Sequence, residues 1–247
     1  MLLNTIQKNI GKKSLAVLLD PDKLDVYSLN QRIEAINTHK IDYIFVGGSL
    51  ITSDKLDWLL TELKAKTTAP KIIFPGHGTH INDKADGILL LSLISGRNAE
   101  FLIGQHVVSA PILKRSSLEI LPVGYILIDG GKPTTVSYIS NTNPIPADKP
   151  DVAAATALAG TLLGLKLIYL DAGSGALNTV KPEVIRAVKK SIETPLIVGG
   201  GINTTEKALQ AWEAGADIIV IGNAIESNPE FIQSLAQARS EAALNFA

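Results

Sequence analysis

The chain has 247 residues, of which 46% are apolar and 19% are charged, and its formal net charge is −1. This length suits one α/β barrel or two small domains, and no linker or shift in composition divides the chain, so we expect a single domain over 1–247. The balanced charge excludes the basic surface typical of nucleic-acid-binding proteins, and the lack of cysteine excludes disulfides and thiolate chemistry.

The N-terminal segment alternates apolar and polar residues and contains lysines, so it lacks the apolar block of a signal peptide. We therefore expect a cytoplasmic protein. The most apolar stretch, Val152–Leu170, is divided by Gly164 into an Ala- and Leu-rich helix over 153–163 and a strand over 165–170. Neither piece is long enough to span a bilayer.

Short apolar runs alternate with amphipathic stretches along the chain, which predicts an α/β fold of the (β/α)8 TIM-barrel type. Their continuous hydrophobicity is typical of parallel strands that are buried on both faces. The predicted strands are 15–20, 41–46, 71–74, 87–93, 119–128, 165–170, 195–198 and 217–221. Helices are expected after most strands, with candidate N-terminal caps at Asp25, Ser53, Thr179 and Asn203.

The interval between the third and fourth predicted strands, residues 75–86, is short and rich in Gly, Asn and Asp. A crossover that includes a helix needs at least about 10–12 residues, so we predict that a loop replaces the third outer helix. The gap would leave an apolar cleft on the barrel wall, suited to a hydrocarbon chain. His77, His80 and Asp83 lie three apart here, but a glycine-rich loop lacks the fixed geometry that favours a metal site.

Polar residues stand at the ends of the first two strands, where a barrel builds its catalytic face. Asp20 ends the first strand, and Ser49 follows Gly47-Gly48 at the end of the second. Their oxygens would suit Mg²⁺, which takes few protein ligands. Asp20 could equally open a proline turn while Asp22 caps the next helix, and Ser49 alone could be a turn residue.

Glycine clusters follow the seventh and eighth strands, at 199–201 and 222, where barrels commonly bind phosphate. Glycine lets several backbone N–H groups converge on one anion, so a ligand with a phosphate group is expected. The sixth strand ends in Tyr169-Leu170-Asp171, followed by a small-residue loop. There Ser174 could contact the phosphate and Asp171 could accept a proton from a substrate hydroxyl. The structural alternative is that Asp171 forms a turn and Tyr169 fills the barrel.

A polar loop that includes Lys132 runs over 129–150, after the fifth strand. Loops of this length are usually functional lids or mobile segments. The sequence leaves both possibilities open.

With these motifs in family order, the chain resembles the geranylgeranylglyceryl phosphate synthase family, which includes bacterial heptaprenylglyceryl phosphate synthases. The resemblance rests on Leu19–Lys23, Val46–Ser49, Tyr169–Gly175, Gly199–Ile202 and Gly222–Asn223. It implies a modified TIM barrel that lacks the third outer helix. It also implies an ether-forming prenyl transfer from a polyprenyl diphosphate, with geranylgeranyl diphosphate as the first candidate, to the C3 hydroxyl of sn-glycerol 1-phosphate, with release of diphosphate.

The resemblance also implies a Mg²⁺ cofactor held by Asp20 and Ser49, with Asp171 as the base. The glycerol phosphate site it implies consists of Tyr169, Leu170, Asp171, Ala172, Gly173, Ser174, Gly175, Gly200, Gly201, Gly222 and Asn223. A homo-oligomer and transient contact with a membrane are expected from the family and from the lipid product.

Two positions depart from the family pattern. Many relatives have Glu at the position of Asp171, so this carboxylate reaches one methylene less far. Some bacterial relatives have a phosphate-binding Lys where this chain has Leu18, which places the chain nearer the archaeal-like branch. Main-chain amides are then left to hold the phosphate.

Two other functions remain open at this stage. A phosphosugar isomerase or aldolase uses the same barrel and phosphate site, and Asp20 and Asp171 could form its acid–base pair. A sensor that binds a phosphorylated ligand without turnover would need only the glycines.

Overall fold

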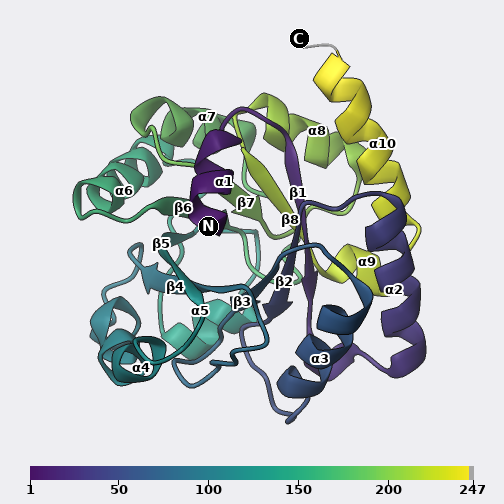
Figure 1. The fold of residues 1–247 in the computed structure, drawn as a ribbon. Coiled ribbons are helices and arrows are strands. Elements are labelled where there is room, and N and C mark those ends of the chain that lie inside the picture. The colour runs from purple at the N-terminus through teal and green to yellow at the C-terminus, as the bar shows by residue number, and fades with distance from the viewer. Residues whose placement is uncertain (245–247) are drawn as a thin grey trace.

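The computed structural model describes residues 1–244, with side chains described as far as residue 240. Parallel strands close into a barrel in the order β1 to β8 (Figure 1). They are β1 Ser14–Leu19, β2 Tyr43–Gly47, β3 Lys71–Phe74, β4 Gly87–Leu93, β5 Glu119–Leu127, β6 Leu167–Asp171, β7 Leu196–Gly199 and β8 Ile218–Ile221. The predicted α/β barrel is confirmed, and each strand lies within two residues of its predicted bounds.

Helices surround the barrel on all sides except between β3 and β4, where residues 75–86 contain no helix. The helices are α1 Leu2–Lys8, α2 Val26–Thr38, α3 Leu56–Lys66, α4 Gln105–Leu113, α5 Thr135–Ser140, α6 Pro150–Leu162, α7 Pro182–Ser191, α8 Thr205–Glu213, α9 Asn223–Ser227 and α10 Phe231–Leu244. Two short turns, η1 Pro21–Lys23 and η2 Glu100–Gly104, follow β1 and β4. The predicted replacement of the third outer helix by a loop is confirmed.

The predicted helix caps are confirmed in one case. The Asp25 carboxylate accepts the backbone N–H of Ser28 at 2.8 Å and begins α2. The caps predicted at Ser53, Thr179 and Asn203 are wrong. Thr204 is the residue that caps α8, and Ser53 donates its hydroxyl to Asp22 ahead of α3. In each wrong case the helix starts two or three residues after the polar residue that was predicted to cap it.

Side chains along each strand point alternately into the barrel and out toward the helices, and this alternation produces two apolar cores. Inward-facing side chains fill the barrel, among them Phe45, Phe74, Tyr125 and Tyr169. Outward-facing side chains pack against the helices in a second, larger core. Each strand is therefore apolar on both faces, which explains its continuous hydrophobicity in the sequence.

Helix α1 closes the N-terminal end of the barrel, and it lies across the middle of the view in Figure 1. Ile6 is buried in the interior core. The backbone N–H groups of Leu2 and Leu3 donate to the Glu119 carboxylate at the start of β5. Because this end is covered, the opposite end is left to bind ligands.

The apolar stretch 152–170 forms two elements, as predicted. Helix α6 ends in a turn in which Gly164 has a φ of +91°, and β6 follows. Among the described residues, no helix is both long and apolar enough to cross a membrane.

Asp217, just before β8, connects three segments at the N-terminal end of the barrel. Its carboxylate accepts the backbone N–H of Gly11 at 2.8 Å and that of Leu196 at 2.7 Å. It also pairs with Lys189 Nζ of α7 at 2.6 Å, and its side chain is only 3% exposed. Both oxygens of the buried Asp217 carboxylate are therefore hydrogen-bonded, which is a condition for such a charge to stabilise a fold.

We expect Asp217→Asn to lower the free energy of unfolding by about 3 kcal/mol, because Lys189 and a backbone N–H lose their acceptor in a buried setting. Urea unfolding at pH 7 measures the loss. The control is Asp148→Asn, at a 70% exposed side chain in a surface ion pair, which should change stability by less than about 0.5 kcal/mol. Equal losses in the two variants would contradict this role of Asp217.

Candidate active site

A cavity opens at the C-terminal ends of the strands, because parallel strands all end at the same face of the barrel. The predicted site residues that line it are Asp20, Ser49, Tyr169, Asp171, Gly173, Ser174, Gly175, Gly200, Gly201, Gly222 and Asn223. Two others, Leu170 and Ala172, face the helices and pack in the outer core instead. The period of β6 explains this split, since Tyr169 and Asp171 point into the barrel and Leu170 points away.

The turn after β7 comes very close to the end of β6. A Cβ on Gly200 would lie 2.6 Å from Asp171 Oδ1 and 2.7 Å from the backbone N atoms of Ala172 and Gly173. Gly200 also has a φ of +81°, which side chains other than glycine rarely adopt. Only glycine therefore fits here, and it brings the two turns together around one point of the cavity.

Asp171 lies at the end of β6 and is 8% exposed. Its Oδ1 accepts the N–H of Gly173 at 2.7 Å, and its Oδ2 accepts the hydroxyl of Tyr125. Burial raises the pKa of Asp171 above its ordinary value, and these two hydrogen bonds offset part of that rise. A carboxylate with a raised pKa is better suited to accept a proton than an exposed one.

Tyr125 on β5 is a site residue that the sequence did not reveal. Its ring packs edge-to-face against Tyr169, with centroids 5.4 Å apart, and against Phe74, with centroids 6.1 Å apart. Burial raises the pKa of the Tyr125 phenol, so it stays a hydrogen-bond donor to Asp171. The register of the two strands places it there, because Tyr125 pairs with Tyr169 and so faces inward beside it.

The Asp20 carboxylate has one oxygen engaged and one facing the cavity. Oδ1 accepts the N–H of Asp22 at 3.0 Å, while Oδ2 lies 3.7 Å from Lys23 Nζ. Burial raises the pKa of Asp20, which indicates a partly desolvated carboxylate. Ser49 lines the same cavity. This carboxylate and hydroxyl fit Mg²⁺, which binds few protein oxygens and completes its shell with water and phosphate.

Asp22 holds the loop after β2 and does not cap a helix. It accepts the backbone N–H groups of Thr52 and Ser53 at 2.7 and 3.1 Å, together with both of their hydroxyls. These hydrogen bonds lower the pKa of Asp22 to about 2. The turn that carries Asp20 is thereby fastened to the loop that carries Ser49.

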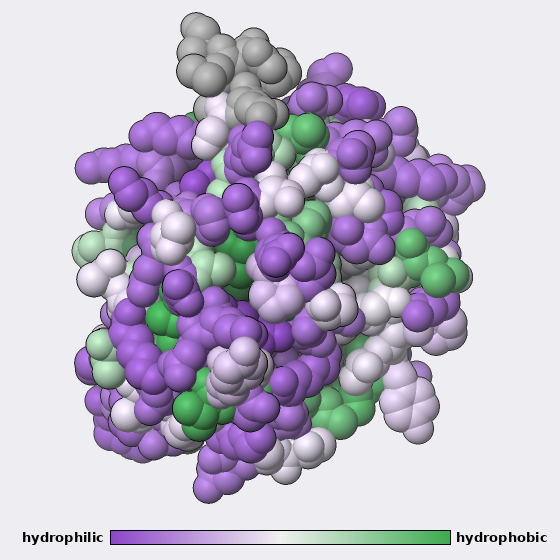
Figure 2. Space-filling model, turned by 90° about the vertical axis from the view of Figure 1, so that its right-hand side faces the viewer, coloured by the Kyte–Doolittle hydropathy of each residue, from purple (hydrophilic) through white to green (hydrophobic). Residues whose placement is uncertain are grey.

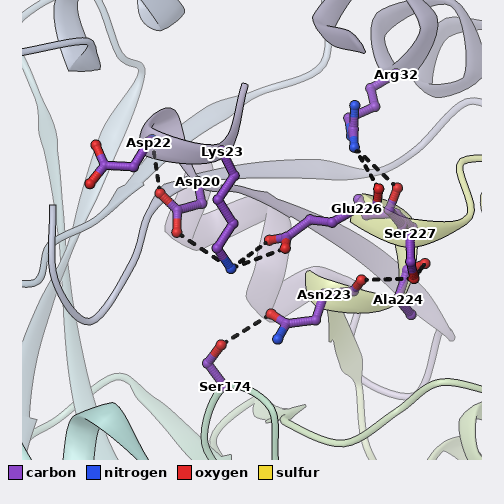
Figure 3. Close-up of polar contacts among 10 residues, drawn as sticks. Asp20, Asp22, Lys23, Arg32, Ser174, Asn223, Ala224, Glu226 and Ser227 are labelled. Carbon is purple, nitrogen blue, oxygen red and sulfur yellow. Dashed lines mark hydrogen bonds and ion pairs between the residues drawn. The ribbon is translucent and has the colours of Figure 1, made fainter. Parts of the chain in front are cut away.

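The loop after β6 and helix α9 contact each other across the cavity. Ser174 Oγ donates to Asn223 Oδ1 at 3.0 Å (Figure 3). Behind α9, the buried Arg32 of α2 donates to the carbonyl oxygens of Ile225 and Glu226 at 3.4 and 3.2 Å. Helix α9 is therefore fixed from both sides, beside the glycine turns.

An apolar groove adjoins this cavity where the third outer helix is absent, as predicted from the short 75–86 interval. The groove runs between β4 and α4, with Ile88 and Leu113 among its lining residues. Helix α5 contributes Val136 to its wall, so the 129–150 segment contains an ordered wall element. Ser49 and Phe74 line both the groove and the cavity, which makes them the junction of the two.

The histidines of the 75–86 loop do not form a metal centre. His77 Nδ1 lies 3.0 Å from the Thr79 hydroxyl, while Asp83 accepts the N–H of Ser117 at 2.8 Å. Across the described residues, no group of three or more His, Cys, Asp or Glu side chains could hold a metal ion. Lys132 is exposed and lies outside the cavity lining.

Comparison with known proteins identifies the family. A model described as the PcrB family matches residues 8–239. The chain belongs to this family. A geranylgeranylglyceryl phosphate synthase of Spirosoma linguale is 54% identical over 92% of this chain and 91% of its own. One from Thermococcus gammatolerans is 43% identical over 90% of this chain and 88% of its own.

Solved structures agree with this assignment. The (S)-3-O-geranylgeranylglyceryl phosphate synthase from Thermoplasma acidophilum, crystallised with its substrate sn-glycerol-1-phosphate, has a TM-score of 0.91 at 34% identity and covers 98% of this chain and 99% of that chain. The tryptophan synthase α-subunit from Pyrococcus furiosus, with a TM-score of 0.56 at 12% identity, shares the fold alone. The family resemblance predicted from the motifs is confirmed.

The raised pKa of Asp171 generates a prediction about stability. The folded protein holds the Asp171 proton more tightly than the unfolded chain, whose ordinary value is 3.8. The protonated Asp171 side chain therefore stabilises the folded state at pH values below 3.8. This stabilisation is lost as the pH rises through the pKa that Asp171 has in the folded protein. At pH 7 the ionised, buried carboxylate is a cost, and unlike Asp217 it has no cationic partner among its hydrogen bonds.

We therefore expect Asp171→Asn to raise the free energy of unfolding by roughly 1 kcal/mol at pH 7, with the gain shrinking toward zero near pH 4. Urea unfolding of the ligand-free protein at both pH values measures this. Asp217→Asn is the matched comparison and should lose stability at pH 7. A loss of similar size in Asp171→Asn would show that the Asp171 carboxylate stabilises the fold.

Proposed function

We propose that this protein is a prenyltransferase that joins the C3 hydroxyl of sn-glycerol 1-phosphate to C1 of a polyprenyl diphosphate, with geranylgeranyl diphosphate as the first candidate. The observation that carries this proposal is the junction at Ser49 and Phe74, where an apolar groove meets a polar cavity. The two compartments match a hydrocarbon chain and a small phosphorylated alcohol. The names of the relatives, and the ligand of the Thermoplasma acidophilum structure, support it.

The polar cavity would hold sn-glycerol 1-phosphate through main-chain groups. The turns at 173–175, 200–201 and 222–223 all line it. Leu18 occupies the position of the lysine of some bacterial relatives, so no ammonium is available there. Backbone N–H groups at these turns would then carry the phosphate contacts.

Asp171 is the proposed base. The C3 oxygen forms a bond to C1 of the prenyl chain, the bond from C1 to the diphosphate oxygen breaks, and its electron pair leaves with the diphosphate. The hydroxyl proton passes to the Asp171 carboxylate. The Gly173 N–H and the Tyr125 hydroxyl fix this carboxylate in place, and the close approach of Gly200 brings the substrate turn toward it.

Asp20 and Ser49 are the residues that would hold Mg²⁺. When bound there, the ion would neutralise charge on the departing diphosphate. The apolar groove excludes water from the reacting carbon, which protects an allylic centre with cationic character.

The groove also separates this proposal from its alternatives. A phosphosugar isomerase or aldolase has a small polar substrate, and a phosphate sensor needs the glycine turns alone. Neither explains an apolar groove, rimmed by Val136 and Leu113, that joins the polar cavity at Ser49.

A homo-oligomer and a cytoplasmic location stay predictions. Exposed apolar side chains on α4 (Val107, Val108) and at the end of α6 (Leu162 and the following Leu163) support association. The face formed by α2, α3 and α10 is largely hydrophilic, with small separate apolar groups (Figure 2). Association, or contact with a membrane that supplies the prenyl substrate, would then use the side that carries α4 and α6.

Formation of the ether product from radiolabelled sn-glycerol 1-phosphate and geranylgeranyl diphosphate tests the function. We expect Asp171→Asn to lower kcat by about 10²–10⁴-fold while the KM for sn-glycerol 1-phosphate changes little, because the base acts in the chemical step. Asp171→Glu, which restores the residue of many relatives, should retain most activity. Near-normal turnover in Asp171→Asn would remove Asp171 as the base.

Removal of divalent metal tests the proposed cofactor. Turnover should fall to background in EDTA and return with Mg²⁺, and Asp20→Asn should raise the Mg²⁺ concentration for half-maximal activity by about tenfold or more. The asparagine keeps an acceptor for the Asp22 N–H, so the turn should survive. Asp148→Asn is the control on the protein surface. Full activity in EDTA would contradict the metal assignment.

A further inference from the structure

The cavity is lined by more negative than positive side chains. Its described lining contains the carboxylates of Asp20, Asp171 and Glu226, and the only Lys or Arg in that lining is Lys23. Both substrates of the proposed reaction are anions. Since the glycerol phosphate is assigned to backbone amides, the position of Lys23 decides where the diphosphate of the other substrate can bind.

Lys23 lies at the metal end of the cavity. Its Nζ is 3.7 Å from Asp20 Oδ2 and 3.0 and 3.1 Å from the two carboxylate oxygens of Glu226. Figure 3 shows the side chain reaching from η1 toward α9, between the two carboxylates. The lysine side chain is 43% exposed, so its ammonium group is accessible from the cavity.

Glu226 is held in place by contacts that do not involve its carboxylate. The buried Arg32 guanidinium donates to the main-chain oxygen of Glu226 at 3.2 Å and to that of Ile225 at 3.4 Å. The Glu226 carboxylate pairs with Lys23 Nζ at 3.0 Å, and the Glu226 side chain is 25% exposed. The backbone of the acidic partner is thus held by Arg32, and the lysine is the longer and more exposed member of the pair.

Building on the proposed function, we propose that Lys23 binds the diphosphate of the prenyl substrate, and that Glu226 holds the lysine in position when this anion is absent. An ammonium group on a flexible stem can turn from one carboxylate to a phosphate oxygen without moving the backbone. The exchange replaces one charge-assisted hydrogen bond with another. Lys23 would then assist the departure of the leaving group from the side of Asp20 and α9.

The diphosphate, and not the glycerol phosphate, is the anion expected at Lys23. The prenyl chain reaches the cavity through the groove, which meets it at Ser49. Gly48, the preceding residue, comes so close to Asp20 that a Cβ there would lie 3.4 Å from Asp20 Oδ2. The end of the groove, the Asp20 carboxylate and the Lys23 ammonium are therefore neighbours. The phosphate turns near Asp171 already have their own amide donors.

The test is a ³¹P NMR titration of the purified protein with inorganic diphosphate, and separately with sn-glycerol 1-phosphate, in EDTA and again with Mg²⁺. We expect Lys23→Met to weaken diphosphate binding by about tenfold in EDTA, the size of one partly exposed charge-assisted hydrogen bond. Binding of sn-glycerol 1-phosphate should change by less than about twofold, and Lys23→Arg should restore diphosphate binding. Lys84→Met is the matched control, because Lys84 is 40% exposed and pairs with Asp57 at 2.7 Å, outside the cavity lining.

Glu226→Gln separates a ligand-binding role from a structural one. Without a competing carboxylate, Lys23 should bind diphosphate about two- to fivefold more tightly. If Glu226→Gln instead weakens diphosphate binding as much as Lys23→Met does, the pair is a structural contact and the proposal is wrong. A loss of sn-glycerol 1-phosphate binding in Lys23→Met, with diphosphate binding unchanged, also overturns it.

The outcome of the binding titrations does not depend on whether the protein turns over its substrates. Absence of the ether product from the wild-type protein overturns the proposed function. The diphosphate titration decides the role of Lys23 alone.

Discussion

The candidate site depends on how closely the turn after β7 approaches the end of β6. Gly200 lies where a Cβ would be 2.6 Å from Asp171 Oδ1, so the backbone of one turn rests against the carboxylate of the other. This contact keeps Asp171 buried, which raises its pKa, and aligns the small-residue turns around one cavity. The same burial that prepares the carboxylate to accept a proton makes it a cost to the fold at neutral pH.

The second constraint is the missing outer helix. A complete ring of helices would cover the wall between β3 and β4, whereas the 75–86 loop leaves an apolar groove that ends beside Ser49. The barrel thus offers a dry channel and a polar cavity that meet at one place. Asp20 and Lys23 stand on the polar side of that junction, and Asp171 lies deeper in the barrel.

The sequence was sufficient to predict the strands and most of the residues at the C-terminal rim of the barrel. Continuous apolar runs located the strands, and residues directly after them, such as Asp20 and Gly200, had to lie at one end of a parallel barrel. It was insufficient where contacts join distant segments. Tyr125 meets Asp171 from 46 residues away, and Lys23 meets Glu226 from 203 residues away. Helix α5 was missed because its capping pair, Thr134 and Ser137, lies in a segment without apolar periodicity.

Calorimetric titration of sn-glycerol 1-phosphate into Gly200→Ala and Gly164→Ala tests the central claim most directly. Both glycines have a positive φ, +81° and +91°, but a Cβ on Gly164 would meet nothing within 4 Å. The account predicts that Gly164→Ala binds like the wild type, and that Gly200→Ala stays folded and binds about a hundredfold more weakly. Equal affinity in the two variants would contradict an anion pocket built on the contact between these two turns.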